Sequence, residues 1–104
     1  MSEQPVEPTK TPLELRREEV ADYQKNIDLY TSVASVLPSE WPEHLIHFKT
    51  RSDRHEAIAE IEDLDEVMLV SDLWAHDQAV AAIRAETVEM RKAMSFLAAL
   101  EAQS

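Results

Sequence analysis

The feature that most constrains this chain is the absence of glycine from its 104 residues. A chain of this length ordinarily holds about seven glycines, since glycine makes up roughly 7% of average proteins. Glycine is the residue that takes positive φ readily and lets the backbone approach a ligand closely. We therefore expect a chain built from helices, without a Walker-type phosphate loop, a dinucleotide-binding turn or an EF-hand loop, all of which require glycine.

The N-terminal part predicts a long helix over residues 12–37. Thr11 can cap its first turn, and Glu14 lies three residues later, where it completes a capping box. Pro38 ends the pattern, because a proline disfavours helical backbone at the residue before it. Apolar residues recur between these limits at helical spacing. The stripe consists of Leu13, Val20, Tyr23, Ile27, Tyr30, Ala34 and Leu37, with Leu29, Val33 and Val36 beside it.

The middle of the chain predicts short helices. Ser39 can cap a helix over about 40–49, in which Trp41, Leu45 and Phe48 share one face. A polar break follows that helix. Further helix starts are indicated at Ser52 or Asp53 and, with Glu66 three residues on, at Asp63.

The C-terminal third predicts one long helix over residues 64–101. Its apolar residues alternate in steps of four and three, the spacing that keeps one edge of a helix facing a partner helix. His76 is a polar residue on this edge, and we expect its ring to be partly solvated at the border of the paired surface. A polar residue at such a position can also fix the register of pairing, and a histidine can make the pairing respond to pH. The positions that we expect to mediate self-association are Leu69, Leu73, His76, Val80, Ile83, Met90, Met94 and Leu97.

The two long helices differ in length. At 1.5 Å per residue, the C-terminal helix would be about 57 Å long and the N-terminal helix about 39 Å. The longer helix must therefore break, with Ser71 and Asp77 as candidate caps, or pair with a second chain, which we favour. The run Val67–Val70 also fits a buried strand, although a strand partner is hard to find. The predicted fold is all-α, a helical hairpin or small bundle with a long coiled-coil-like C-terminal helix, and oligomeric.

The charge of the chain is strongly negative. Its 21 acidic and 10 basic residues give a formal net charge of −11. No Lys or Arg occurs between Arg54 and Arg84. Such a surface repels phosphate backbones and anionic lipids and attracts basic proteins, so we expect a basic protein partner and no direct binding of nucleic acid or membrane. The acidic surface expected to dock that partner consists of Glu56, Glu60, Glu62, Asp63, Asp65, Glu66, Asp72 and Asp77.

These features predict a non-enzymatic interaction module, an adaptor or regulatory subunit, that binds no cofactor. One alternative is a mimic of nucleic acid that inhibits a DNA- or RNA-binding protein through its rows of carboxylates. Another is a small helical enzyme or metal-binding bundle that uses His44, His47 and His55 with nearby carboxylates. The chain lacks the Glu-x-x-His pairs of di-iron bundles, so no metal, catalytic or cofactor-binding residues are assigned.

Two expectations concern organisation and location. Residues 1–11 hold two prolines among polar residues and predict a flexible tail, which leaves residues 12–104 as a single all-α domain. No segment approaches the 18 or so apolar residues that cross a bilayer, and the N-terminus lacks the pattern of a signal peptide. A cytoplasmic location is expected.

Overall fold

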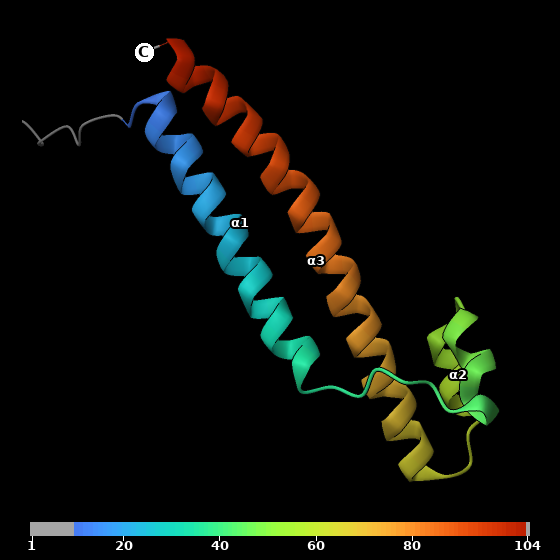
Figure 1. Cartoon of the computed structure of the whole chain (residues 1–104). Helices are drawn as coiled ribbons and strands as arrows, with labels where there is room; N and C mark the ends of the chain where they lie inside the picture. Colours follow the sequence, from blue (N-terminus) through green and yellow to red (C-terminus); the bar gives the residue numbers. More distant parts are fainter. Residues whose placement is uncertain (1–9, 104) are drawn as a thin grey trace, which may run out of the picture.

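The structure is a computed structural model that describes residues 10–103, and within them it holds only helices. In chain order these are α1 (Pro12–Ser35), the 3₁₀ helix η1 (Glu43–Thr50), α2 (Arg54–Ala59) and α3 (Leu64–Gln103). Figure 1 shows α1 and α3 antiparallel and side by side, with the segment after α1 crossing α3 to reach η1 and α2. The predicted all-α hairpin with a long C-terminal helix is confirmed. Most of the predicted tail, residues 1–9, and Ser104 lie outside the described residues.

Helix α1 begins where the sequence indicates. The Thr11 hydroxyl accepts a hydrogen bond from the backbone N–H of Glu14 at 3.2 Å, and Pro12 occupies the first helical position. The helix ends two residues earlier than expected, at Ser35. Its last turn tightens into three-residue hydrogen bonds, from Val36 to Val33 and from Leu37 to Ala34, both 3.3 Å long.

Helix α3 is continuous over 40 residues, about 60 Å at the rise of an α-helix. The Asp63 side chain accepts a hydrogen bond from the backbone N–H of Asp65 at 2.9 Å, which caps the first turn as predicted. The break considered at Ser71 or Asp77 does not occur. Ser71 instead donates its hydroxyl to the Val67 carbonyl one turn earlier, at 2.9 Å. The strand alternative for Val67–Val70 is wrong, because this run forms about one turn of α3.

The middle segment differs from expectation in its helix type and cap. The predicted α-helix over 40–49 is instead the 3₁₀ helix Glu43–Thr50, preceded by Pro42 rather than by a Ser39 cap. A 3₁₀ helix has three residues per turn, which places Leu45 and Phe48 on the same side, and both are buried. Asp53 caps α2 as predicted, by accepting hydrogen bonds from the backbone N–H groups of two residues in its first turn.

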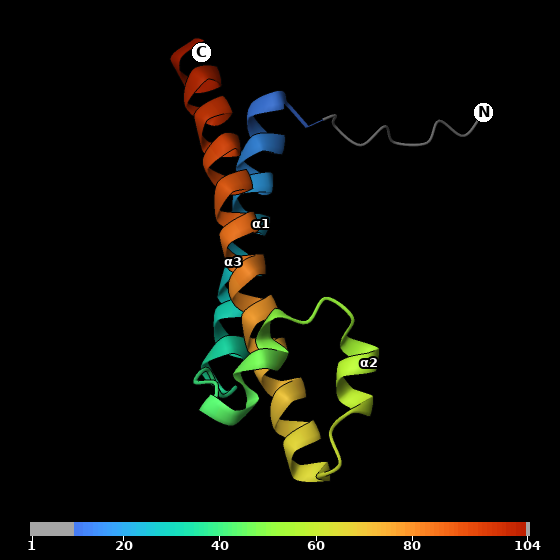
Figure 2. The same cartoon turned by 90° about the vertical axis from the view of Figure 1, so that its right-hand side faces the viewer.

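Residues 40–77 form what we call the foot, in which η1 and α2 pack on the first turns of α3 (Figure 2). The Trp74 indole N–H donates to the Phe48 carbonyl at 3.1 Å, and the Trp41 indole N–H donates to Asp77 at 3.1 Å. Both tryptophans are thus anchored at their polar atom as well as by packing. The buried residues of the foot are Trp41, Leu45, Phe48, Ala57, Val70, Leu73 and Trp74.

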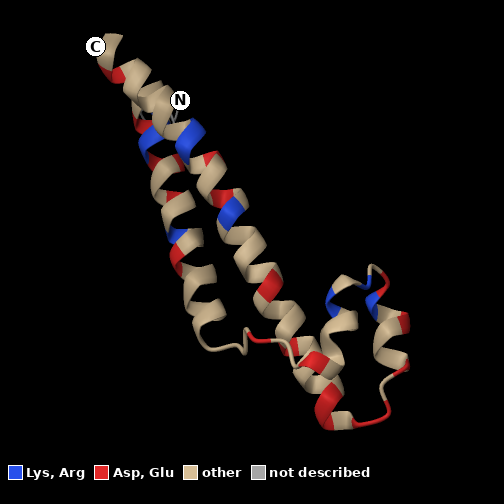
Figure 3. Cartoon of the chain, turned by 45° about the vertical axis from the view of Figure 1, so that its right-hand side comes forward, with Lys and Arg blue, Asp and Glu red and all other residues tan. Residues whose placement is uncertain are grey.

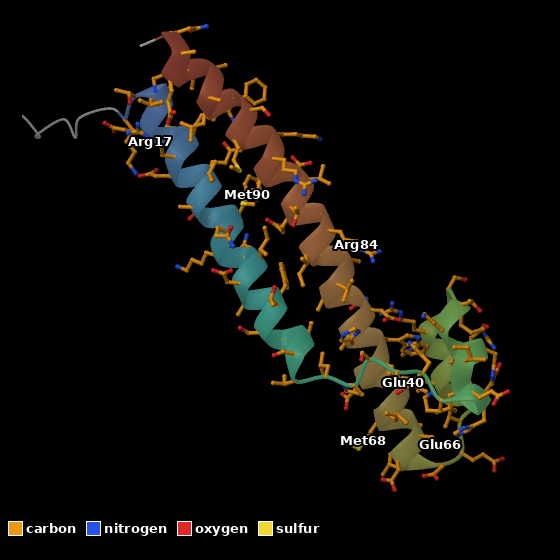
Figure 4. All side chains as sticks on the ribbon, in the orientation of Figure 1. Arg17, Glu40, Glu66, Met68, Arg84 and Met90 are labelled. Atoms are coloured by element: carbon orange, nitrogen blue, oxygen red, sulfur yellow. The ribbon has the colours of Figure 1, made fainter. Side chains whose placement is uncertain are left out.

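The arm, by contrast, has almost no buried side chains. It consists of α1 and of residues 78–103 of α3, and its fully buried residues are Ala79 and Ala93. The apolar stripe predicted on α1 does face α3, but each of its members is only half-buried. Met90 points into the space between the two helices (Figure 4). Two helices alone therefore leave the arm with a thin interface.

The overall shape is elongated. The Cα radius of gyration is 21.2 Å and the principal extents are 67 × 40 × 23 Å, whereas a compact domain of this length has a radius near 13 Å.

Among the described residues, no helix is long and apolar enough to cross a membrane.

Candidate interaction surfaces

An apolar groove lies between α1 and α3 where the arm joins the foot. Its volume is about 440 Å³, and we call it the arm groove. Leu29 on its α1 side is 61% exposed, although leucine is a residue that helices normally turn toward a core. On its α3 side the groove is lined mainly by alanines, whose short side chains leave the space between the helices open. The groove is lined by Leu29, Tyr30, Val33, Ala75, Gln78, Ala79 and Ala82.

The apolar surface continues past the end of α1. Leu64, Met68 and Ala75 are spaced by four and seven residues, so they share one side of α3. Met68 is 60% exposed and Leu64 is 71% exposed, and Met68 points away from η1 and α2 (Figure 4). Because α1 ends at Ser35, this side of the first turns of α3 lies beyond its reach.

The foot carries most of the net charge. Residues 40–77 hold eleven Asp and Glu against three Lys and Arg, a net charge of −8. The arm, residues 12–35 and 78–103, holds eight acidic and six basic residues, a net charge of −2. Figure 3 colours the ribbon by residue type, and it shows many acidic positions in the foot, while basic and acidic positions are interspersed along the arm. The structure therefore separates a highly acidic end from a nearly neutral one.

Four of the eight predicted docking carboxylates are engaged within the foot. Glu60 binds Arg51 through two hydrogen bonds of 3.0 and 3.1 Å, and these hydrogen bonds lower the pKa of the Glu60 carboxyl. Glu66 lies 3.0 Å from the His44 ring. Asp77 accepts from Trp41, and Asp63 caps α3. The carboxylates that remain for a partner are Glu56, Glu62, Asp65 and Asp72, all exposed.

Two basic residues of the foot are also occupied. Arg51 is held by Glu60, and the Arg54 guanidinium stacks over the Trp74 ring at 5.2 Å from its centroid. Sequence spacing did not reveal either contact, because each one joins residues that are brought together only by the packing of η1, α2 and α3. They leave the acidic surface with little internal compensation.

The positions predicted for self-association separate into two groups. Leu73 is fully buried in the foot, and Leu69 packs against the same core. These two residues are therefore used within the monomer. Along the arm, Met94 is exposed. Val80, Ile83, Met90 and Leu97 are half-buried.

His76 is also half-buried, in the foot. Its Nδ1 atom lies 3.6 Å from an oxygen of Asp77, which is too far for a hydrogen bond. This nitrogen has no hydrogen-bond partner among the described residues. Asp77 uses its other oxygen to accept from Trp41.

The candidate metal-binding histidines are not brought together. His44 reaches α3 through Glu66, whereas His47 stacks against Phe48 at a ring-centroid distance of 4.0 Å. No group of three or more His, Cys, Asp or Glu side chains in residues 10–103 is arranged to hold a metal ion.

The arm groove is the feature that the sequence analysis missed. The signal for it was present, because Leu29, Val33 and Val36 widen the α1 stripe beyond what a single partner helix can cover.

Comparisons of this chain with protein-family models, with curated proteins and with solved structures give no match.

Proposed function

We propose that this protein is a non-enzymatic, acidic, helical interaction module, an adaptor or regulatory subunit, that self-associates and docks a basic protein partner. The observation that carries the proposal is the thin interior of the arm, where two alanines are buried. Large apolar side chains remain exposed nearby, among them Leu29, Val36 and Met68. Contiguous apolar surface of this kind marks sites of protein association. We place the module in the cytoplasm as part of the same proposal.

Self-association would use the side of α3 opposite the arm groove. Ala79 and Ala93 mark the line of α3 that faces α1. With about 100° of rotation per residue, Val80, Ile83 and Met94 turn to one side of this line, and the groove residues Gln78 and Ala82 turn to the other. A second hairpin on the first side would complete a four-helix arrangement, which is how bundles enclose their cores.

Docking of a basic protein would use the foot. Its net charge of −8 is concentrated within one end of the molecule, and its unengaged carboxylates face solvent. Such a field accelerates encounter with a cationic protein, most strongly at low ionic strength. The arm, being nearly neutral, would be free to pair with a second copy.

Sedimentation velocity tests the self-association. We expect the wild type to form a dimer, and Met94→Glu to dissociate it because a carboxylate would enter the paired face. Val88→Glu is the matched control, since Val88 is equally exposed on the outer side of α3. A monomeric wild type at high micromolar concentration would refute self-association.

Affinity capture from an extract of the native host tests the docking. The variant Glu56→Gln, Glu62→Gln, Asp65→Asn, Asp72→Asn should lose a basic protein that the wild type retains in low salt. The control neutralises four arm carboxylates, Glu14, Asp22, Asp28 and Glu89, and so has the same net charge. Equal capture by both variants would refute a docking role for the foot. A captured protein that DNA displaces would favour the alternative of a nucleic-acid mimic.

A further inference from the structure

We infer that the arm groove is the seat of a cationic amphipathic helix supplied by the basic partner. This inference rests on the proposed function and names where, and through what chemistry, the partner docks. The helix would lie along the junction of α1 and α3, with its apolar face in the groove and its basic face toward the foot.

The groove and the exposed apolar face beyond it together have the length of a helix. Leu64, Met68 and the alanines of the groove extend the apolar line from residue 64 to residue 82 of α3. Eighteen residue steps span about 27 Å, which matches a partner helix of about five turns. The small side chains of Ala75 and Ala82 let a helix axis approach closely. Leu29 and Val33 form the opposite wall, so apolar anchors at positions i, i+4 and i+7 of the partner have places to bury.

The charge around the groove selects a basic occupant. The segments that build and surround it, residues 26–48 and 55–83, contain no Lys or Arg. Asp72 precedes Ala75 by one turn of α3, and Glu86 follows Ala82 by one turn. A helix seated along residues 64–82 would therefore have Asp72 near its middle, Glu86 beyond one end and the acidic foot beside it.

The same charges disfavour a second copy as the occupant. A second copy that pairs groove to groove would bring Asp72 of one copy against Asp72 or Glu86 of the other, and residues 64–83 of α3 hold no cation to compensate for Asp72. Like charges placed across an interface weaken association and select against that partner. The exposed apolar residues on the other side of α3 leave a separate place for self-association.

Binding of synthetic peptides to the full chain tests the inference. The probe is an 18-residue peptide with Leu on one helical face and Lys elsewhere, measured by calorimetry at 50 mM and 500 mM NaCl. One comparison peptide has the same composition in an order that abolishes the apolar face. Another carries Glu in place of Lys. We expect the first peptide to bind at least tenfold more tightly than either comparison peptide, and to weaken at high salt.

Substitutions at exposed positions locate the site without disturbing the fold. Leu29→Gln with Val33→Gln should weaken the Leu/Lys peptide about tenfold, since each removes an apolar wall of the groove. Leu15→Gln is the matched control, because Leu15 is 52% exposed on α1 outside the groove. Helicity by circular dichroism should be unchanged in both the double variant and the control.

Three outcomes overturn the inference. Equal binding of the scrambled peptide would reduce the interaction to charge alone, and the proposed docking at the foot would survive. Absence of binding by the Leu/Lys peptide at 50 mM NaCl would remove the groove as a site for a cationic helix. A dimer that dissociates on Leu29→Gln with Val33→Gln would assign the groove to a second copy. The proposed function fails by a separate measurement: the foot variant without the four carboxylates would capture the same protein from the host extract as the arm control.

Discussion

The foot and the arm are made from the same long helix but are held together differently. In the foot, seven buried side chains enclose one another, and both tryptophan N–H groups have hydrogen-bond acceptors. In the arm, the two fully buried side chains are alanines, and the remaining apolar residues lie half in solvent. Full burial of a large apolar side chain is worth about 1.5–3 kcal/mol. The foot therefore has a closed core, and the arm keeps its apolar surface for association.

The intrinsic probes of the chain separate along the same boundary. Trp41 and Trp74 are both in the foot, and Tyr23 and Tyr30 are both in the arm. Tryptophan fluorescence therefore reports unfolding of the foot. Far-ultraviolet circular dichroism reports mainly the arm, which holds most of the helical residues. Substitutions in the foot should therefore change mainly the tryptophan signal, and substitutions in the arm should change mainly the circular dichroism.

Leu73→Ala should have the largest effect, because Leu73 is fully buried in the foot. The substitution removes the isopropyl group of the side chain and leaves a cavity, which lowers the free energy of unfolding by about 3 kcal/mol. Urea unfolding followed by tryptophan fluorescence measures this loss. The exposed Met68 provides the control, as Met68→Ala should cost less than about 0.5 kcal/mol. Equal effects of the two substitutions would contradict the closed core.

Ala93→Leu should destabilise the arm by about 2 kcal/mol, because no space separates Ala93 from α1 and a larger side chain would push the helices apart. Loss of helicity by circular dichroism should precede loss of tryptophan fluorescence in this variant. Ala98→Leu, at an exposed position of α3, should leave the midpoint nearly unchanged. A stabilised Ala93→Leu protein would show that the arm has room to spare.

Thr11→Ala should cost about 1 kcal/mol of helix stability, which is the usual effect of losing an N-cap side chain. The backbone N–H of Glu14 loses its acceptor, so α1 frays from its first turn. Amide hydrogen exchange at residues 13–16 should accelerate, while the tryptophan signal stays at the wild-type midpoint. A lowered tryptophan midpoint would mean that arm and foot unfold as one unit.

The pH dependence of the Arg51–Glu60 pair should be the smallest effect, because both side chains are solvent-accessible. Hydrogen bonding to Arg51 lowers the pKa of Glu60 below its ordinary value of 4.5. The pair therefore stabilises the foot above that value, and the contribution disappears as the pH falls through the lowered pKa. The difference in unfolding midpoint between the wild type and Glu60→Gln should shrink toward zero in acid. Glu62→Gln should show no such convergence.

Local patterns in the sequence predicted the helices, and the reasons are local. Thr11, Asp53 and Asp63 cap helices through their own side chains, so their function depends only on neighbouring residues. The foot was less predictable. Trp74 bonds to a carbonyl 26 residues away, and Arg51 to a carboxylate nine residues away. Such contacts depend on how the chain turns between helices, which helical periodicity does not encode.

The edge of α3 shows the same limit. The 4-3 alternation correctly predicted a long helix with an apolar edge, but it did not distinguish an edge that meets another copy from one that meets the foot. Leu73 belongs to the expected edge and is enclosed by η1 and α2, whereas Met94 on the same edge is exposed. Of the acidic surface, half of the expected carboxylates proved to be engaged in capping, pairing or indole binding. The other half remains on the surface as predicted.

Amide hydrogen exchange on the isolated chain tests the contrast between the two regions most directly. At a concentration too low for association, the amides of Val70–Trp74 should exchange at least tenfold more slowly than those of Leu29–Val33, since only the former sit over a closed core. Equal protection of the two segments in the monomer would contradict the account, because it would show that the arm needs no partner to hold its helices together.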